Sequence, residues 1–123
     1  MRYYDANSEF ERIREIISDE IRSGVNSLTA SRLIQKYDLS PNSVQQVLTD
    51  LASVGDLETH YWVLCCGEHQ NFDVDREFSK ESDIPNYSIT CNTCQDLYTP
   101  QREHIFVSFE PTASFKKYLQ EAS

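Results

Sequence analysis

The sequence TASRLIQKYDLS occupies residues 29–40 and predicts two helices joined by a short turn. Thr29 is a residue type that caps the start of a helix, and Leu28 and Leu33 flank it as a hydrophobic pair. The side chains expected to face inward from the first of these helices are Ala30, Leu33, Ile34 and Tyr37. Ser40 is the expected cap of the second, after a turn at residues 38–39.

Further helical patterns extend in both directions from this stretch. Downstream, Pro41 is suited to the first position of a helix, which Gly55 would close. The buried stripe expected on that helix is Val44, Val47, Leu48 and Leu51. Upstream, the capping box SEFE at residues 8–11 is expected to start a helix that ends at residues 23–24. Its expected apolar stripe is Phe10, Ile13, Ile17 and Ile21.

Three helices, with a turn of three or four residues between the second and third, are typical of a helix-turn-helix unit. Together with the strand pattern that follows, residues 8–64 resemble the winged helix-turn-helix superfamily. In that superfamily the third helix usually enters the DNA major groove, and the strand hairpin after it is the wing. The resemblance implies a fold and leaves the function open.

The third helix lacks the charges that DNA contact requires. The side chains that would face a groove are Asn42, Ser43, Gln45, Gln46, Thr49, Asp50 and Ser53. The amides could read adenine, but none of these residues is basic and Asp50 would repel phosphate. Arg32 and Lys36 on the preceding helix are the nearby cations. The pattern therefore disfavours DNA binding and favours a protein-interaction module.

Two alternating stretches predict a pair of β-strands. Residues 57–64 (LETHYWVL) and residues 104–109 (HIFVSF) alternate with a period of two, and the second stretch stops at Pro111. We expect these strands to pair as the wing hairpin, with the segment between them grafted at its tip. Within that segment, residues 76–86 are polar and predict a loop.

The grafted segment contains two pairs of candidate metal ligands. Cys66-x-x-His69 and Cys91-x-x-Cys94 have the same spacing and lie 25 positions apart. This spacing lets a tight turn direct both side chains of a pair at one ion, and two such turns make a Cys₃His shell. The sequence therefore predicts a zinc ribbon that holds one structural zinc ion per chain through Cys66, His69, Cys91 and Cys94.

Cys65 offers another register, because Cys65-x-x-x-His69 could also supply ligands. Only the Cys66 register repeats the second pair, so Cys65 is interpreted as a buried thiol at the end of a strand. A disulfide between adjacent cysteines would be strained, and a redox-active Cys-x-x-Cys normally opens a helix, whereas turn and strand residues follow Cys94. Structural cysteines without a metal remain an alternative.

A last short helix is expected over residues 115–121, capped by Thr112 or Ser114. Phe115, Tyr118 and Leu119 lie on one side of it and either dock back on the core or contact another protein. The expected fold class is α+β: a three-helix winged helix with a small β zinc ribbon at the wing. The expected division is a winged-helix unit over 1–60, wing strands and ribbon over 61–111, and the last helix over 112–123.

Composition limits the classes of function. The chain has 123 residues and a formal net charge of −9, with acidic residues in excess in both halves. Such a charge opposes unspecific binding of nucleic acid. The longest strongly apolar run, Tyr61 to Cys66, is too short to span a membrane, and the first residues do not form a signal peptide. The expected protein is soluble and cytoplasmic, with reduced thiols.

The sequence does not predict an enzyme. His60 and His104, on the two expected strands, lack a nucleophile or carboxylate at an interpretable spacing, and four protein ligands would close the zinc shell. In architecture the chain resembles the helical and ribbon modules of transcription factor E and small adaptor subunits of bacterial multi-protein systems. The sequence favours an adaptor or regulatory subunit that binds a larger protein; a sequence-specific DNA-binding regulator is the alternative.

Overall fold

A computed structural model describes residues 2–65 and 74–121 of this chain. In chain order the elements are α1 (Arg2–Arg22), α2 (Ala30–Tyr37), α3 (Pro41–Ser53), β1 (Leu57–Leu64), β2 (Val74–Phe78), the 3-10 turn η1 (Glu81–Asp83), β3 (Ile89–Thr90), β4 (Leu97–Tyr98), the 3-10 turn η2 (Arg102–His104), β5 (Ile105–Pro111) and α4 (Ala113–Glu121). Over the described residues, helices and short strands are combined as the expected α+β class requires. The strands form one sheet in the order β2-β1-β5 and a second sheet of β3 and β4.

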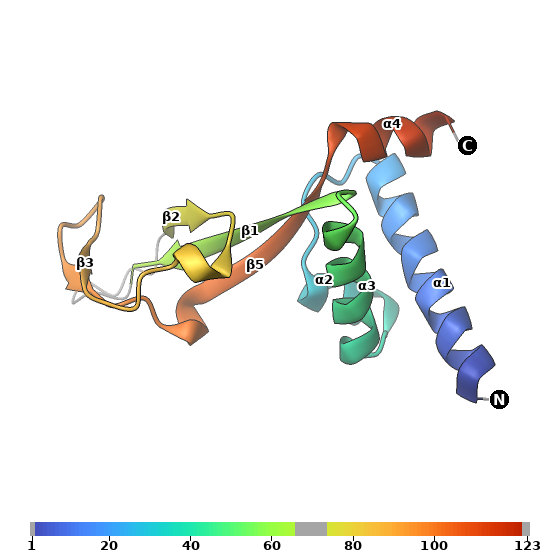
Figure 1. Ribbon diagram of the computed structural model, residues 1–123, viewed down its shortest axis with the longest axis horizontal. Helices are drawn as coiled ribbons and strands as arrows, with labels where there is room; N and C mark the ends of the chain where they lie inside the picture. The colour runs from blue at the N-terminus through green and yellow to red at the C-terminus, as the bar shows by residue number, and fades with distance from the viewer. Residues whose placement is uncertain (1, 66–73, 122–123) are drawn as a thin grey trace. The chain divides into compact units, whose positions relative to one another are not determined.

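The chain divides into two compact units. The helical unit consists of Met1–Glu58 with Phe109–Ser123, and the ribbon unit consists of Thr59–Ser108. In the helical unit, α3 packs against both α1 and α2, and α4 packs against α1 (Figure 1). The buried core of this unit comprises Ile13, Ile17, Ile21, Leu28, Leu33, Leu39, Val44, Val47, Leu48, Leu57, Phe109, Phe115 and Leu119. The apolar stripes predicted on the helices therefore face one shared core.

The last helix docks back on that core. Phe115 and Leu119 are buried in it, one helical turn apart. Tyr118, predicted on the same side, is instead 64% exposed. Its ring stacks beside that of Phe115, with the two ring centroids 6.5 Å apart. The buried face of α4 is therefore narrower than the sequence indicates.

Local residues explain the ends of α2 and α3. The Thr29 hydroxyl accepts the N–H of Arg32 at 3.4 Å, so Thr29 is the cap that the sequence predicts. Asp38 ends α2 in the left-handed region, with φ of 53°, and its N–H donates to the carbonyl of Ile34. Gly55 follows α3 with φ of 86°, a conformation that glycine adopts without strain.

Two predicted helix caps, Ser8 and Ser40, do not act in the structure as the sequence predicts. Ser8 does not start α1, because the helix already begins at Arg2. Residues 2–7 contain neither glycine nor proline, so nothing interrupts the helix upstream of the capping box. Ser40 occupies the cap position of α3, but among the described residues its hydroxyl makes no cap hydrogen bond. The next residue, Pro41, has no N–H, so no donor is left without a partner at the first position of the helix.

The strands predicted on either side of the ribbon are hydrogen-bonded neighbours. β1 lies between β2 and β5, and the indole N–H of Trp62 in β1 donates to the hydroxyl of Ser108 in β5 at 2.8 Å. β5 begins at Ile105, one residue later than predicted, because the preceding three residues form η2. Within the ribbon unit, pairing with β2 and β5 fixes the position of the end of β1, and Cys65 follows there.

The loop predicted over residues 76–86 is partly wrong. Residues 74–78 form β2, which pairs antiparallel with β1 so that Val63 lies opposite Arg76. Residues 81–83 form η1. The sequence does not reveal this strand, because an edge strand need not alternate apolar and polar residues. Val74 is half exposed, and Phe78 is the apolar residue of β2 that packs against the core of the ribbon unit. Its backbone pairing, not an apolar face, makes it a strand.

Candidate metal centre

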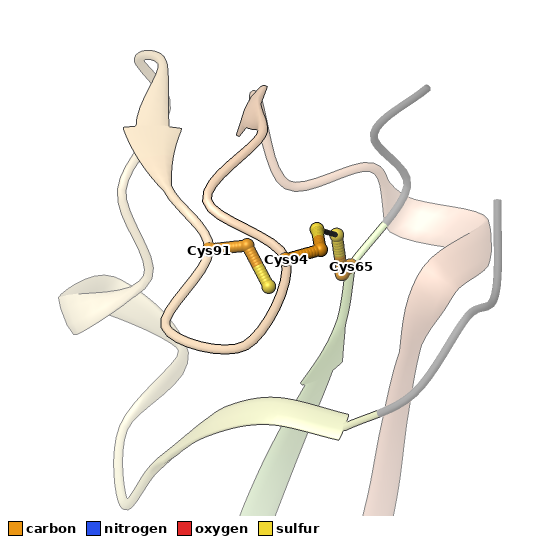
Figure 2. Close-up of side chains that lie close together, drawn as sticks. All are labelled: Cys65, Cys91 and Cys94. Carbon is orange, nitrogen blue, oxygen red and sulfur yellow. Dashed lines mark hydrogen bonds between the residues drawn. The ribbon is translucent and has the colours of Figure 1, made fainter. Parts of the chain in front are cut away.

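Three cysteine side chains converge inside the ribbon unit (Figure 2). Cys65 directly follows β1, and Cys91 and Cys94 lie on the turn between β3 and β4. The three sulfur atoms lie within 4.8 Å of one another, and those of Cys65 and Cys94 are 3.4 Å apart. Cys65 and Cys91 are buried, whereas Cys94 is partly exposed. This group is able to hold a metal ion.

The backbone around Cys91 folds tightly enough to bring its pair together. The N–H of Gln95 donates to the carbonyl of Cys91 at 3.1 Å, and the N–H of Cys91 donates to the carbonyl of Asp96 at 2.9 Å. Gln95 adopts φ of 68°, the left-handed conformation that reverses the chain. The two-residue gap therefore forms the turn that the spacing predicts.

The same turn favours the thiolate form of Cys91. Burial alone would raise the pKa of this thiol, but backbone N–H groups of Cys94 and Thr93 and the side chains of Cys65 and Cys94 donate hydrogen bonds to its sulfur. The Thr93 nitrogen lies 3.4 Å from that sulfur. Together these donors bring the pKa below its usual value. A thiolate is the form in which cysteine binds a metal.

The spacing of the sulfur atoms fits a shared ion. Zn–S bonds of about 2.3 Å in a tetrahedral shell place neighbouring sulfur atoms about 3.8 Å apart. The sulfur atoms of Cys65 and Cys94 lie 3.4 Å apart, somewhat closer than this, and all three lie within 4.8 Å of one another. A disulfide would instead require about 2.05 Å, well below the 3.4 Å between Cys65 and Cys94. A set of soft thiolates is chemically suited to zinc and to other thiophilic metals.

The structure brings together only part of the predicted ligand set. Cys91 and Cys94 are adjacent as expected. Cys66 and His69 lie outside the described residues, so their assignment as ligands stays a prediction. Cys65 is buried after a strand, as interpreted from the sequence, but its sulfur also lies in the cluster. The alternation of β1 could have indicated that Cys65 faces the cluster. Residues two apart in a strand share a face, so Cys65 lies on the same side as the buried Val63.

A buried carboxylate supports the turn from β2. The side chain of Asp75 accepts hydrogen bonds from the backbone of Asn92, from Arg76 and from the hydroxyl of Tyr98. Burial alone would raise the pKa of Asp75, but these donors, Tyr98 first, hold it below its usual value. Burial and the hydrogen bond to Asp75 raise the pKa of Tyr98. The pair thus consists of an ionised acid and a neutral phenol at pH 7.

His60 in β1 contacts neighbouring side chains of the ribbon unit. Nδ1 of His60 lies 2.5 Å from a carboxylate oxygen of Glu77, and the ring of His60 stacks on that of Trp62. Among the described residues, the cluster that could hold a metal contains cysteines and neither His60 nor His104. The preference for packing histidines over a ligand pair agrees with this arrangement.

No protein-family model matches the sequence, and no curated protein or solved structure matches it significantly. None of the helices in the described part of the chain combines the length and apolar character needed to cross a bilayer.

Proposed function

We propose that this protein is a non-enzymatic zinc-binding adaptor, in which a zinc ribbon is built on a winged helix. The observation that carries the proposal is the convergence of Cys65, Cys91 and Cys94 inside a very small core. Apart from cysteines, the buried residues described in that core are Val63 and Tyr98, with Phe78, Ile84, Ile89 and Ile105 partly buried against them. So little apolar burial is insufficient to fold a ribbon, whereas a structural metal supplies folding free energy directly.

The proposed ligand set uses Cys65 as the third thiolate. Its sulfur lies 3.4 Å from that of Cys94, so a shared ion would contact both without rearrangement of the chain. The fourth ligand is His69, which the sequence supplies in the register Cys65-x-x-x-His69. A shell of four protein ligands leaves no position for substrate and gives the zinc a structural role.

Metal analysis of two cysteine variants tests this centre. Protein purified without chelator should contain about one zinc per chain, Cys65→Ala should lose it, and Cys66→Ala should retain it. The two residues are adjacent and chemically identical, so each variant is the control for the other. Loss of zinc from Cys66→Ala alone would instead support the register that repeats the spacing of the second pair. Wild-type protein with far less than half an equivalent would contradict a zinc centre.

The helical unit supports the winged-helix component of the proposal. Helices α2 and α3 are joined by three residues, 38–40, and β1 follows α3 closely. The amide groups of α3 that would read bases make hydrogen bonds within the helix. Nε2 of Gln46 donates to Asp50 at 2.9 Å, and Nε2 of Gln45 donates to Thr49 at 3.4 Å. A base contact would have to break these bonds.

Phosphate contacts are equally poor on this surface. The sequence of α3 has no lysine or arginine. Lys36 on α2 already donates to the buried carboxylate of Glu20 at 2.7 Å, which leaves Arg32 as the nearby cation whose charge is not paired in the described residues. Against a net charge of −9, this surface attracts a basic protein more readily than a polyanion. We therefore favour a larger protein partner over DNA.

Two binding measurements test the choice of partner. We expect no shift of random duplex DNA at micromolar protein and physiological salt, because each phosphate contact that steers binding needs a cation. We expect a stable complex with a larger protein from the native host, which Leu97→Ser or Phe106→Ser should weaken. Both side chains are more than half exposed, so these variants should keep their fold. Duplex binding that Gln45→Ala or Gln46→Ala weakens would favour the DNA-binding regulator.

A further inference from the structure

Asp75 is a buried acid that bonds to the backbone of the cysteine turn. Its side chain has no exposed surface. One carboxylate oxygen accepts the N–H of Asn92, the residue after Cys91, at 2.9 Å. The other accepts Nε of Arg76 at 2.8 Å and the hydroxyl of Tyr98. Both oxygens of this acid therefore have donors.

Arg76 completes the arrangement on the other side of Cys91. Its Nη2 donates to the carbonyl of Thr90, the residue before Cys91, at 2.7 Å. Two consecutive residues of β2 thus hold the backbone immediately before and immediately after one cysteine of the cluster. Thr90 belongs to β3, so the same pair also ties β2 to the small second sheet.

An ion pair between a fully buried Asp75 and a partly exposed Arg76 is a weak stabiliser of a fold. Removing a carboxylate and a guanidinium from water costs free energy that their attraction and hydrogen bonds only offset. Apolar side chains at the same positions would hold β2 in place equally well. A carboxylate differs from them in one respect, because it can accept the N–H of Asn92 and so fix the conformation of the turn itself.

We infer that Asp75 is a positioning residue for the metal centre, and that with Arg76 it sets the backbone on both sides of Cys91 in the conformation that binds the ion. The inference rests on the zinc centre proposed above. These hydrogen bonds offset part of the conformational freedom that the turn loses when metal binds and the ribbon folds. Contacts that orient metal ligands are typically worth about 10- to 100-fold in affinity.

Metal competition with a chromophoric chelator tests this role, on full-length zinc-loaded variants whose ribbon unit resists protease as that of wild type does. Asp75→Asn keeps the size and one acceptor but loses the charge, and should bind zinc about tenfold more weakly. Tyr98→Phe leaves Asp75 its other donors and should weaken binding about threefold. Asp83→Asn, at an exposed acid of the same unit, is the matched control and should bind like wild type.

Cobalt substitution separates positioning from general stability. If Asp75 sets the turn, the visible absorption bands of Co²⁺ bound to Asp75→Asn should shift from those of wild type. A residue that only stabilises the fold would change the unfolding midpoint, and with it the apparent affinity, but would leave the bands unchanged. That result in Asp75→Asn would overturn the positioning role alone. If Asp75→Asn fails to fold, wild-type affinity in Tyr98→Phe would overturn it instead. Wild-type protein that takes up no metal would overturn the zinc centre as well.

Discussion

Glu20 joins two helices through one buried carboxylate. Its Oε1 accepts the ammonium of Lys36 at 2.7 Å and the hydroxyl of Tyr37 at 2.6 Å, which links α1 to α2. The hydrogen bond from Lys36 and then that from Tyr37 hold the pKa of Glu20 below its usual value. The hydrogen bond to Glu20 raises the pKa of Lys36 in turn. A charge at this position therefore stabilises the helical unit.

The pH dependence of stability follows from these directions. Because the folded pKa of Glu20 is depressed, its contribution is present above the unfolded value of about 4.3 and is lost as pH falls through the folded pKa. Glu20→Gln should lower the free energy of unfolding at pH 7 by about 1–2 kcal/mol, and this deficit should shrink as the buffer becomes more acidic than pH 4. Urea unfolding followed by helical circular dichroism measures both quantities.

The control is Glu15→Gln, which removes an exposed acid from the same helix. It should change stability much less than Glu20→Gln at pH 7. Equal effects of the two variants at pH 7 would contradict a special role of the buried carboxylate.

At the scale of elements, turns are as important as the stripes on the helices. Gly55 follows α3 with φ of 86°, and no atom lies within 4 Å of the Cβ that another residue would add there. The cost of a substitution is therefore backbone strain alone, without a steric clash. The loss of stability on substituting Gly55 therefore measures how strongly the turn between α3 and β1 requires a residue in the left-handed conformation.

Gly55→Ala should lower the free energy of unfolding by about 1 kcal/mol, because alanine tolerates this conformation poorly. Gly55→Asn should lower it less, since asparagine enters the left-handed region more readily. Thermal unfolding of both variants measures the difference. Stability of Gly55→Ala equal to that of wild type would mean that the turn rearranges at no cost.

Elements with a local physical signature could be predicted from the sequence. The cap at Thr29 and the glycine at residue 55 act through their own backbone conformations, and the structure has both as predicted. β2 could not be recognised, because its edge position and the burial of Asp75 depend on partners in β1 and β4. The position of the Cys65 sulfur likewise depends on how β1 faces the turn after β3, and spacing alone favoured its neighbour.

At the scale of the whole molecule, the two units are stabilised by different means. The helical unit buries apolar residues from all four described helices in one core. The described core of the ribbon unit contains two cysteines among its buried residues. The first unit therefore has a hydrophobic core of ordinary composition, whereas the second has a small core that includes cysteines able to hold a metal ion.

Metal removal should unfold the ribbon unit and leave the helical unit folded. Binding requires deprotonated thiols, so a chelator at mildly acidic pH should strip the zinc and unfold the ribbon unit. Protease sites should become accessible within residues 59–108, while the helical circular dichroism should largely remain. That signal reports on the helical unit, because the described helices of the ribbon unit are single 3-10 turns. Joint loss of zinc and helicity would reveal one cooperative structure instead.

The helical unit closes on itself where the chain leaves it and returns. The N–H of Thr112 donates to the carbonyl of Asp56 at 3.0 Å, and its hydroxyl lies 3.2 Å from the carbonyl of Gly55. The segment that contains the cysteine cluster leaves this closure and comes back to it, as an exchangeable cassette would. Evolution or a protein engineer could thus replace residues 59–108 by a shorter connection, or by another module, and keep the closure between residues 55–56 and Thr112.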